Sequence, residues 1–152
     1  MATSADVLTG RKEIRNKDVV LIGAGMTGLE TAEYLQSLGN RVSVYDLLPG
    51  VAMGEHFQNI MDVEMRLSDV PQYTEHKLIQ ITKDGCTFQK ADGTEVVVPC
   101  EEVVLSMGMR PNKVFAEQFK DFPNYRVLGT NDTYSAIGPA VESGYLAAYH
   151  LA

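Results

Sequence analysis

The chain has 152 residues, about the length of one typical domain. Hydrophobic residues make up 45% and charged residues 22%, a balance that excludes wholesale disorder and collagen-like repetition. The formal net charge is −7 and no basic stripe is present, so we expect no nucleic-acid partner. No apolar run reaches the roughly 20 residues of a membrane span, and no cationic and apolar leader is visible. We therefore expect no membrane association and a cytoplasmic location.

The first half of the chain predicts a strand, a helix and a second strand. Residues 1–17 are small, polar and basic without sustained periodicity, and they predict an arm or linker. The apolar run Asp18–Ile22 predicts a buried strand, and Arg41–Tyr45 predicts its neighbour. Between them, one apolar face predicts a helix over 26–38, with Leu29, Ala32, Leu35 and Leu38 inward. So short a unit forces a parallel pair with a right-handed crossover.

The second half predicts shorter elements of mixed type. A helix is expected over 55–67, with Phe57, Ile60, Met61 and Met65 inward. Three strand-like runs, 77–82, 86–90 and 94–98, are separated by Asp-Gly pairs, which predicts an antiparallel meander. A buried strand over 102–107, a short helix Val114–Phe119, a strand over 126–128 and a final helix over 138–151 follow. The expected fold class is α/β: a Rossmann-like parallel sheet flanked by helices, with a three-stranded antiparallel β-meander inserted.

A glycine-rich motif follows the first predicted strand. The segment Gly23-Ala24-Gly25-Met26-Thr27-Gly28 fits G-x-G-x-x-G and opens a predicted helix, as a dinucleotide-binding fingerprint requires. The first glycine allows a tight turn, the second lets a diphosphate approach the backbone, and the third lets helix and strand pack closely. The N-terminus of the helix then offers free N–H groups to the diphosphate, and Thr27 can add a hydroxyl donor.

An acidic residue, Asp46, ends the second predicted strand, 18 residues after Gly28. A carboxylate there can accept hydrogen bonds from the ribose hydroxyls of an adenosine, and it would repel a 2′-phosphate. The next residues are Leu47, Leu48 and Pro49, so no arginine follows, and NAD(H) is favoured over NADP(H). The pattern alone leaves FAD open, because both cofactors use this fingerprint. A site for S-adenosylmethionine is disfavoured, since Thr27 stands where its usual loop has glycine.

Longer stretches carry a family resemblance. The segment DVVLIGAGMTGLETAEYLQSLGNRVSVYD resembles the nicotinamide-nucleotide domain of the pyridine-nucleotide disulfide oxidoreductase superfamily. EEVVLSMGMRPN resembles the motif that closes this domain, and the meander lies where the family carries its β-insertion. ADVLTG and IGPAVESGYLAAYHL are most similar to flavin-dependent NADH oxidoreductases of the 2-enoate and 2,4-dienoyl-CoA reductase type, relatives of old yellow enzyme.

The resemblance implies how the chain is organised and what it does. Residues 18–112 would form an NAD(H)-binding domain, and 113–152 would return to an FAD domain. Thr130 stands where the family's returning segment has an aspartate for the flavin, and no second G-x-G-x-x-G is present. NADH would therefore be positioned for hydride transfer to a flavin held elsewhere, and this chain alone would bind without turnover. A stand-alone dinucleotide-binding or sensing module is the alternative that the same fingerprint supports.

The cofactor-binding residues expected from the motifs and the resemblance form one set. They are Gly23, Ala24, Gly25, Met26, Thr27, Gly28, Glu30, Asp46, Leu47, Met107 and Gly108. Glu30 is included in this set because the resemblance implies that it lies near the nicotinamide carboxamide. The alternative is that Glu30 lies on a solvated face of the helix. No catalytic residue and no metal site are predicted, since the three histidines have no ligand spacing.

Two further expectations concern association and the cysteines. The last predicted helix carries an apolar stripe of Ile137, Val141, Gly144, Tyr145 and Ala148. We expect this stripe to dock on the chain's own sheet or to pair with a second copy, because a bare apolar stripe favours association. Cys86 and Cys100 are too far apart for a CxxC motif, which predicts two free thiols and leaves a single disulfide open.

Overall fold

The structure, a computed structural model, describes residues 1–108, 113–129 and 137–150. The chain forms two compact units, Met1–Gly108 and Met109–Ala152. The first unit is built on a five-stranded sheet in the order β1-β8-β2-β3-β4, in which every neighbouring pair is parallel. These strands are β1 (Ala2–Thr3), β2 (Asp18–Ile22), β3 (Arg41–Tyr45), β4 (Gln72–Tyr73) and β8 (Glu102–Leu105).

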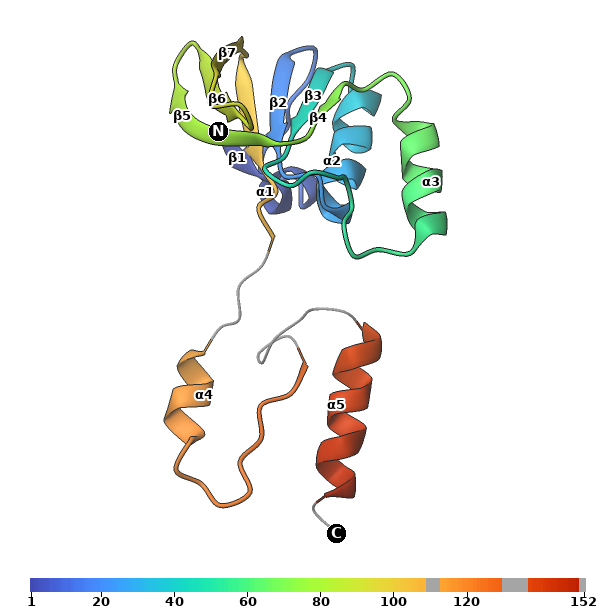
Figure 1. Ribbon diagram of the computed structural model, residues 1–152, viewed down its shortest axis with the longest axis vertical. Coiled ribbons are helices and arrows are strands. Elements are labelled where there is room, and N and C mark those ends of the chain that lie inside the picture. The colour runs from blue at the N-terminus through green and yellow to red at the C-terminus, as the bar shows by residue number, and fades with distance from the viewer. Residues whose placement is uncertain (109–112, 130–136, 151–152) are drawn as a thin grey trace. The chain divides into compact units, whose positions relative to one another are not determined.

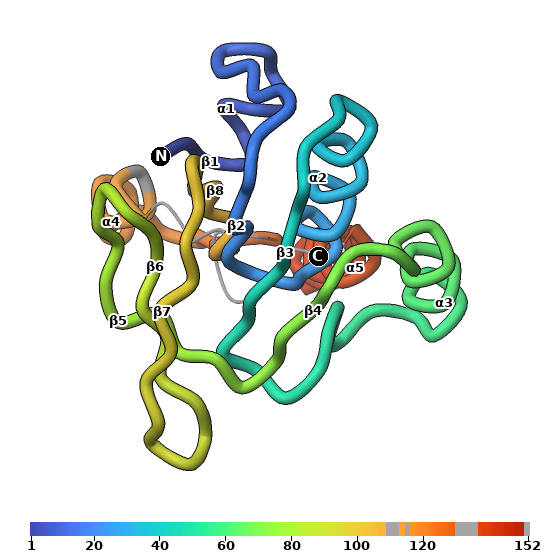
Figure 2. The backbone as a smooth tube through the Cα atoms, turned by 90° about the horizontal axis from the view of Figure 1, so that it is seen from above, coloured from blue at the N-terminus to red at the C-terminus, as the bar shows by residue number. Residues whose placement is uncertain are grey.

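Helices and a second sheet cover opposite faces of the parallel sheet (Figures 1 and 2). The helices of this unit are α1 (Ser4–Leu8), α2 (Met26–Ser37) and α3 (Phe57–Arg66). The second sheet is an antiparallel meander of β5 (His76–Thr82), β6 (Gly85–Lys90) and β7 (Glu95–Pro99). The Rossmann-like fold and its β-insertion are thereby confirmed.

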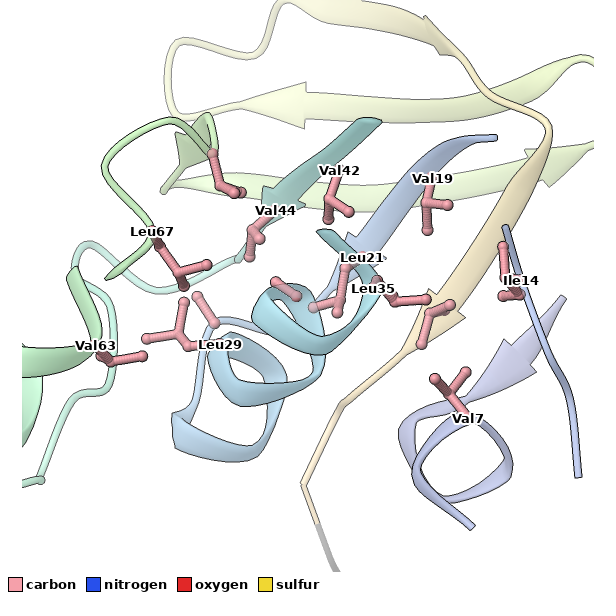
Figure 3. Packing of buried hydrophobic residues seen from close by; sticks show 14 of the residues in the cluster. Val7, Ile14, Val19, Leu21, Leu29, Leu35, Val42, Val44, Val63 and Leu67 are labelled. Carbon is pink, nitrogen blue, oxygen red and sulfur yellow. The ribbon is translucent and has the colours of Figure 1, made fainter. Parts of the chain in front are cut away.

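The alternating side chains of the parallel strands build two cores. Val19, Leu21, Val42 and Val44 pack against the helices in one cluster (Figure 3). Their neighbours in sequence, among them Val20 and Tyr45, face the meander in the other cluster. Because both faces of the sheet are buried, its strands are apolar nearly throughout, as the continuous runs predict.

The N-terminal 17 residues differ from the expected arm. They form β1, which pairs with β8, and α1, which begins with a capping box between Thr3 and Asp6. Val7 and Ile14 are buried in the core on the helical side of the sheet. Val7 lies beside the exposed Leu8 and Ile14 lies between two charged residues, so no sustained periodicity reveals them.

Helix α3 is present where expected, and of its predicted inward side chains Ile60 packs on the core, whereas the prediction is wrong for Phe57, Met61 and Met65. Phe57 and Met65 are each 73% exposed, whereas Val63 is fully buried. The helix packs through Ile60 and Val63, and Leu67 continues this face just after its end. Phe57, Met61 and Met65 lie on another face, and both sets have helical spacing, so periodicity alone could not choose between them.

The second unit contains the helices α4 (Val114–Phe119) and α5 (Ile137–Tyr149). Residues 126–128 form no strand, contrary to the expectation. No residue of α5 is buried, so its pairing with a second copy stays a prediction. The expected turn at 110–112 and Thr130 lie outside the described residues. Among the described helices, none has the length and apolar character needed to cross a bilayer.

Candidate functional site

A pocket of about 670 Å³ opens where β2, β3 and β8 end, at the carboxyl edge of the parallel sheet. Ligands of open parallel sheets bind at this edge, outside the carboxyl ends of the strands. Five segments line the pocket: the glycine loop with the end of β2, the turn after β3, Glu55 before α3, the start of β5 and the turn after β8. The lining residues are Ile22, Gly23, Gly25, Met26, Thr27, Gly28, Asp46, Leu47, Leu48, Glu55, His76, Lys77, Leu78, Ser106, Met107 and Gly108.

The three glycines of the loop meet different surroundings. A Cβ on Gly23, whose φ is +109°, would lie 2.1 Å from the carbonyl oxygen of Ser106. A Cβ on Gly28 would lie 1.9 Å from the carbonyl oxygen of Gly23. Around Gly25, in contrast, a Cβ would meet no atom within 4 Å. The first and third glycines are therefore needed for packing, whereas the second keeps the pocket floor open for a ligand to approach the backbone.

The N-terminus of α2 faces this open floor without a capping side chain. Gly25 is the N-cap and provides no side-chain hydrogen bond. The first N–H groups of a helix have no partners within the helix, and they carry the positive end of its dipole. Together with the space at Gly25, these groups form a cradle that fits a diphosphate.

Asp46 is held in place by two backbone groups. The N–H of Ala24 donates to Oδ2 at 2.5 Å, and the N–H of Leu48 donates to Oδ1 at 2.8 Å. An ionised carboxylate has about four acceptor positions, so each oxygen keeps one for a ligand. The carboxylate is thus oriented at the pocket wall and still able to accept hydrogen bonds from two hydroxyl groups.

The β-insertion contributes residues to the pocket that the motifs do not identify. His76, Lys77 and Leu78 lie at the start of β5, and Glu55 precedes α3. Lys77 has no ion-pair partner within 4 Å in the described part of the chain. These residues lie far from the glycine loop in sequence, and the only signal for them was the expected place of the insertion.

Nine of the eleven expected cofactor-binding residues line this one pocket, and the other two do not. Ala24 is buried beside the pocket and holds Asp46 through its N–H. Glu30 lies one turn further along α2, and its side chain is exposed. Its role near a nicotinamide stays a prediction, as does the binding role of the whole set.

Among the described residues, we find no second cluster of reactive side chains outside this pocket. The described residues contain no group of three His, Cys, Asp or Glu side chains that could hold a metal ion. Cys86 and Cys100 are free thiols, and Cys86 is buried. Burial raises the pKa of Cys86 to about 12, which leaves it protonated and unreactive near neutral pH.

A second pocket, of about 400 Å³, lies at the amino edge of the sheet. Asp18, Asn40, Arg41 and Ser43 are among the residues that line it. Arg41 donates to both oxygens of Asp18, at 2.5 and 2.6 Å. Asn40 donates to the carbonyl groups of Ile14 and Leu35. The side chains of Asp18, Asn40 and Arg41 in this second pocket therefore already have hydrogen-bond partners within the protein.

Comparison with known proteins agrees with the geometry at the carboxyl edge. Residues 1–125 match the model of the family described as pyridine nucleotide-disulphide oxidoreductase. The bilirubin reductase of Mediterraneibacter gnavus (strain CC55_001C) is 35% identical over 141 residues, which are 90% of this chain and 22% of that protein. The NADH oxidase of Thermoanaerobacter brockii is 26% identical over 151 residues, 96% of this chain and 23% of that protein.

Solved structures show the same fold. The 2-naphthoyl-CoA reductase in complex with 2-naphthoyl-CoA superposes with a TM-score of 0.79 at 23% identity, covering 94% of this chain and 22% of that one. The chain spans about a fifth of the length of the curated relatives it matches. The family match extends over most of the chain and includes the glycine loop, Asp46 and the β-insertion. The chain therefore belongs to the pyridine nucleotide-disulphide oxidoreductase family.

Proposed function

We propose that this chain binds NAD(H), in preference to NADP(H), and positions it for hydride transfer to a flavin held outside these 152 residues. The observation that carries the proposal is the pairing of the open floor at Gly25 with the oriented carboxylate of Asp46. The first feature fits a diphosphate and the second fits the ribose of an adenosine. These two features lie in the same pocket, as one dinucleotide requires.

Each part of the pocket has a role in this proposal. The N–H groups at the start of α2 hold the diphosphate, and Asp46 accepts hydrogen bonds from the two ribose hydroxyls. Ser106, Met107 and Gly108, which follow β8, line the pocket beside the glycine loop and would flank the nicotinamide half. When bound, the nicotinamide supplies the hydride chemistry, and the protein supplies binding and orientation.

The preference for NAD(H) rests on the charge next to the ribose. A 2′-phosphate would approach the Asp46 carboxylate, which two backbone bonds hold in place. Lys77 lines the same pocket but is exposed, so solvent screens its attraction for a phosphate. We expect the fixed carboxylate to have the larger effect.

Calorimetric titrations with NADH and NADPH test the proposal. We expect a dissociation constant for NADH in the micromolar range, about −8 kcal/mol, with weaker binding of NADPH. Asp46→Asn should reduce the preference for NADH over NADPH, because it removes the charge that repels the 2′-phosphate. Asp69→Asn, at the amino edge of the sheet, is the matched control and should leave the ratio unchanged.

Two results would contradict the proposal. Failure of the chain to bind either nucleotide would remove the binding role. Steady oxidation of NADH by the purified, flavin-free chain would contradict the proposal that hydride transfer needs a flavin held elsewhere. A chain that binds NADH and changes a partner's activity without any flavin would instead favour the sensing module.

A further inference from the structure

A short segment of the β-insertion lies directly beside the acidic end of β3. The backbone N–H of His76 donates to the carbonyl oxygen of Asp46 at 2.8 Å. The N–H of Glu75 donates to the carbonyl oxygen of Leu48 at 3.0 Å. These two bonds fix His76 next to the carboxylate to which the proposed function assigns the ribose, and the inference below rests on that function.

The imidazole ring of His76 is held in one orientation. Its Nδ1 lies 2.6 Å from the carbonyl oxygen of Thr74. Its ring meets that of Tyr45 edge-on, with centroids 5.7 Å apart, and meets that of Phe88 in the same way at 6.4 Å. His76 is half-buried and is one of the residues that line the pocket, and these contacts position its ring before a ligand binds.

These contacts determine which ring nitrogen carries the proton. A carbonyl oxygen can only accept a hydrogen bond, so Nδ1 must be the donor to Thr74. In the neutral imidazole the other nitrogen, Nε2, is then an acceptor. No donor within the described ranges lies within hydrogen-bonding distance of Nε2.

The place of the adenine base follows from the positions of the other two groups. The diphosphate lies at the start of α2 and the ribose at Asp46, so the base continues past Asp46, away from the glycine loop. Among the lining residues, Leu47 and Leu48 follow Asp46 in the chain, His76 is hydrogen-bonded to the backbone of Asp46, and Leu78 lies two residues further along β5. The leucine side chains suit the faces of a flat ring, and His76 offers one hydrogen-bond acceptor.

We propose that Nε2 of His76 accepts a hydrogen bond from the exocyclic 6-amino group of adenine and makes the pocket selective for a 6-amino purine. Hypoxanthine has the same shape, but it carries a carbonyl oxygen at this position. That oxygen would bring a second acceptor against Nε2, and neither atom would have a donor. Sites built around a hydrogen bond discriminate strongly against analogues that leave their groups unpaired.

Titration of the full chain with two dinucleotides tests this selectivity without any mutation. Reduced nicotinamide hypoxanthine dinucleotide differs from NADH at C6, where an oxo group replaces the amino group, and at the adjacent N1, which then carries a hydrogen. We expect the hypoxanthine analogue to bind about tenfold more weakly. Equal affinities would overturn the role of His76 and leave the proposed function standing, whereas absence of binding by both dinucleotides would overturn both.

A variant pair assigns the selectivity to this residue. His76→Phe keeps an aromatic ring against Tyr45 and Phe88 but removes the acceptor, so we expect it to bind the two dinucleotides equally. His56→Phe is the matched control, because His56 precedes α3 and does not line the pocket. A tenfold preference that survives in His76→Phe would contradict the proposal.

The protonation of the ring provides a readout that needs neither activity nor a stable variant. Long-range ¹H–¹⁵N spectra of the imidazole should show the proton of neutral His76 on Nδ1. The Nε2 resonance should shift when NADH is added, and shift less with the hypoxanthine analogue. A proton found on Nε2 in the free chain, or equal shifts with both ligands, would overturn the inference.

Discussion

The two edges of the parallel sheet both carry a pocket lined by polar groups, but they differ in how those groups are used. At the carboxyl edge, the start of α2 has no capping side chain, and Asp46 keeps unused acceptor positions. At the amino edge, Arg41 and Asp18 form a bidentate ion pair that neutralises both charges. Unused hydrogen-bonding groups, rather than volume or polarity, are therefore the reason that we propose the carboxyl edge as the binding site.

The amino edge instead attaches the N-terminal segment to the sheet. Glu102, at the start of β8, is only 11% exposed and accepts a hydrogen bond from Lys12 at 2.9 Å. Lys17 lies 3.6 Å from the same carboxylate. Both lysines belong to the first 17 residues, so these ion pairs join that segment to the sheet. Binding and stability are thus assigned to opposite edges, and substitutions can test that separation.

The largest effect is expected at Gly28. In Gly28→Ala the new Cβ would overlap the carbonyl oxygen of Gly23, a backbone atom of the turn that joins β2 to α2 and that cannot move aside as a flexible side chain could. We expect a loss of about 3 kcal/mol or more in the free energy of unfolding, measured by urea denaturation. Unchanged stability would contradict the close packing of strand and helix.

Gly25→Ala should separate binding from stability. The backbone at Gly25, with φ −70° and ψ 169°, suits alanine, and the added methyl group would enter open space. We expect nearly unchanged stability and at least a tenfold loss of NADH affinity, about 1.4 kcal/mol or more, in calorimetry. Gly138→Ala in α5 also adds a methyl group in open space and is the control. Equal NADH affinities for the two variants would contradict the proposed role of the glycine loop in binding the diphosphate.

Glu102→Gln should affect stability alone. The pKa of Glu102 is lowered in the folded state, and the hydrogen bond from Lys12 is the main cause. Folding therefore favours the ionised carboxylate. We expect a loss of about 1 kcal/mol at pH 7. Because the folded-state pKa is lowered, the stabilisation is present above the ordinary value of 4.5 and disappears as pH falls through the lower value. In thermal unfolding, the midpoint temperatures of the original chain and of Glu102→Gln should converge as the pH falls through this range. The NADH affinity of the variant should be unchanged at pH 7.

The smallest effect is expected at Arg41. Its pair with Asp18 is exposed, and exposed ion pairs contribute little to stability. Arg41→Gln should leave both the unfolding midpoint and NADH affinity within experimental scatter. A clear loss of NADH affinity in this variant would mean that the amino edge takes part in binding.

The elements around the site could be predicted from sequence because local signals coincide there. Apolar runs predict β2 and β3, glycine spacing predicts the turn into α2, and Asp-Gly pairs predict the meander. The close packing at Gly28 also follows from sequence, since it depends on the nearby backbone of Gly23, whereas the contact of Gly23 with Ser106 joins segments far apart in sequence. Asp46 could be found because it immediately follows a predicted strand.

The remaining features depend on contacts that no local pattern records. β4 has two residues and exists because it pairs with β3. His76 and Lys77 reach the pocket only through the pairing of segment 72–76 with 44–48, which lie far apart in sequence. The inward face of α3 was ambiguous because two apolar stripes fit the same helix, and tertiary packing decided between them.

A ¹H–¹⁵N NMR titration of the chain with NADH tests the central claim most directly, because it reports both edges of the sheet at once. We expect amide signals of residues 23–28, 46–48 and 106–108 to shift together with one affinity. Signals of Asp18, Asn40 and Arg41 at the amino edge should remain in place. Shifts confined to the amino edge, or no shifts at millimolar NADH, would contradict the assignment of a dinucleotide to the carboxyl edge.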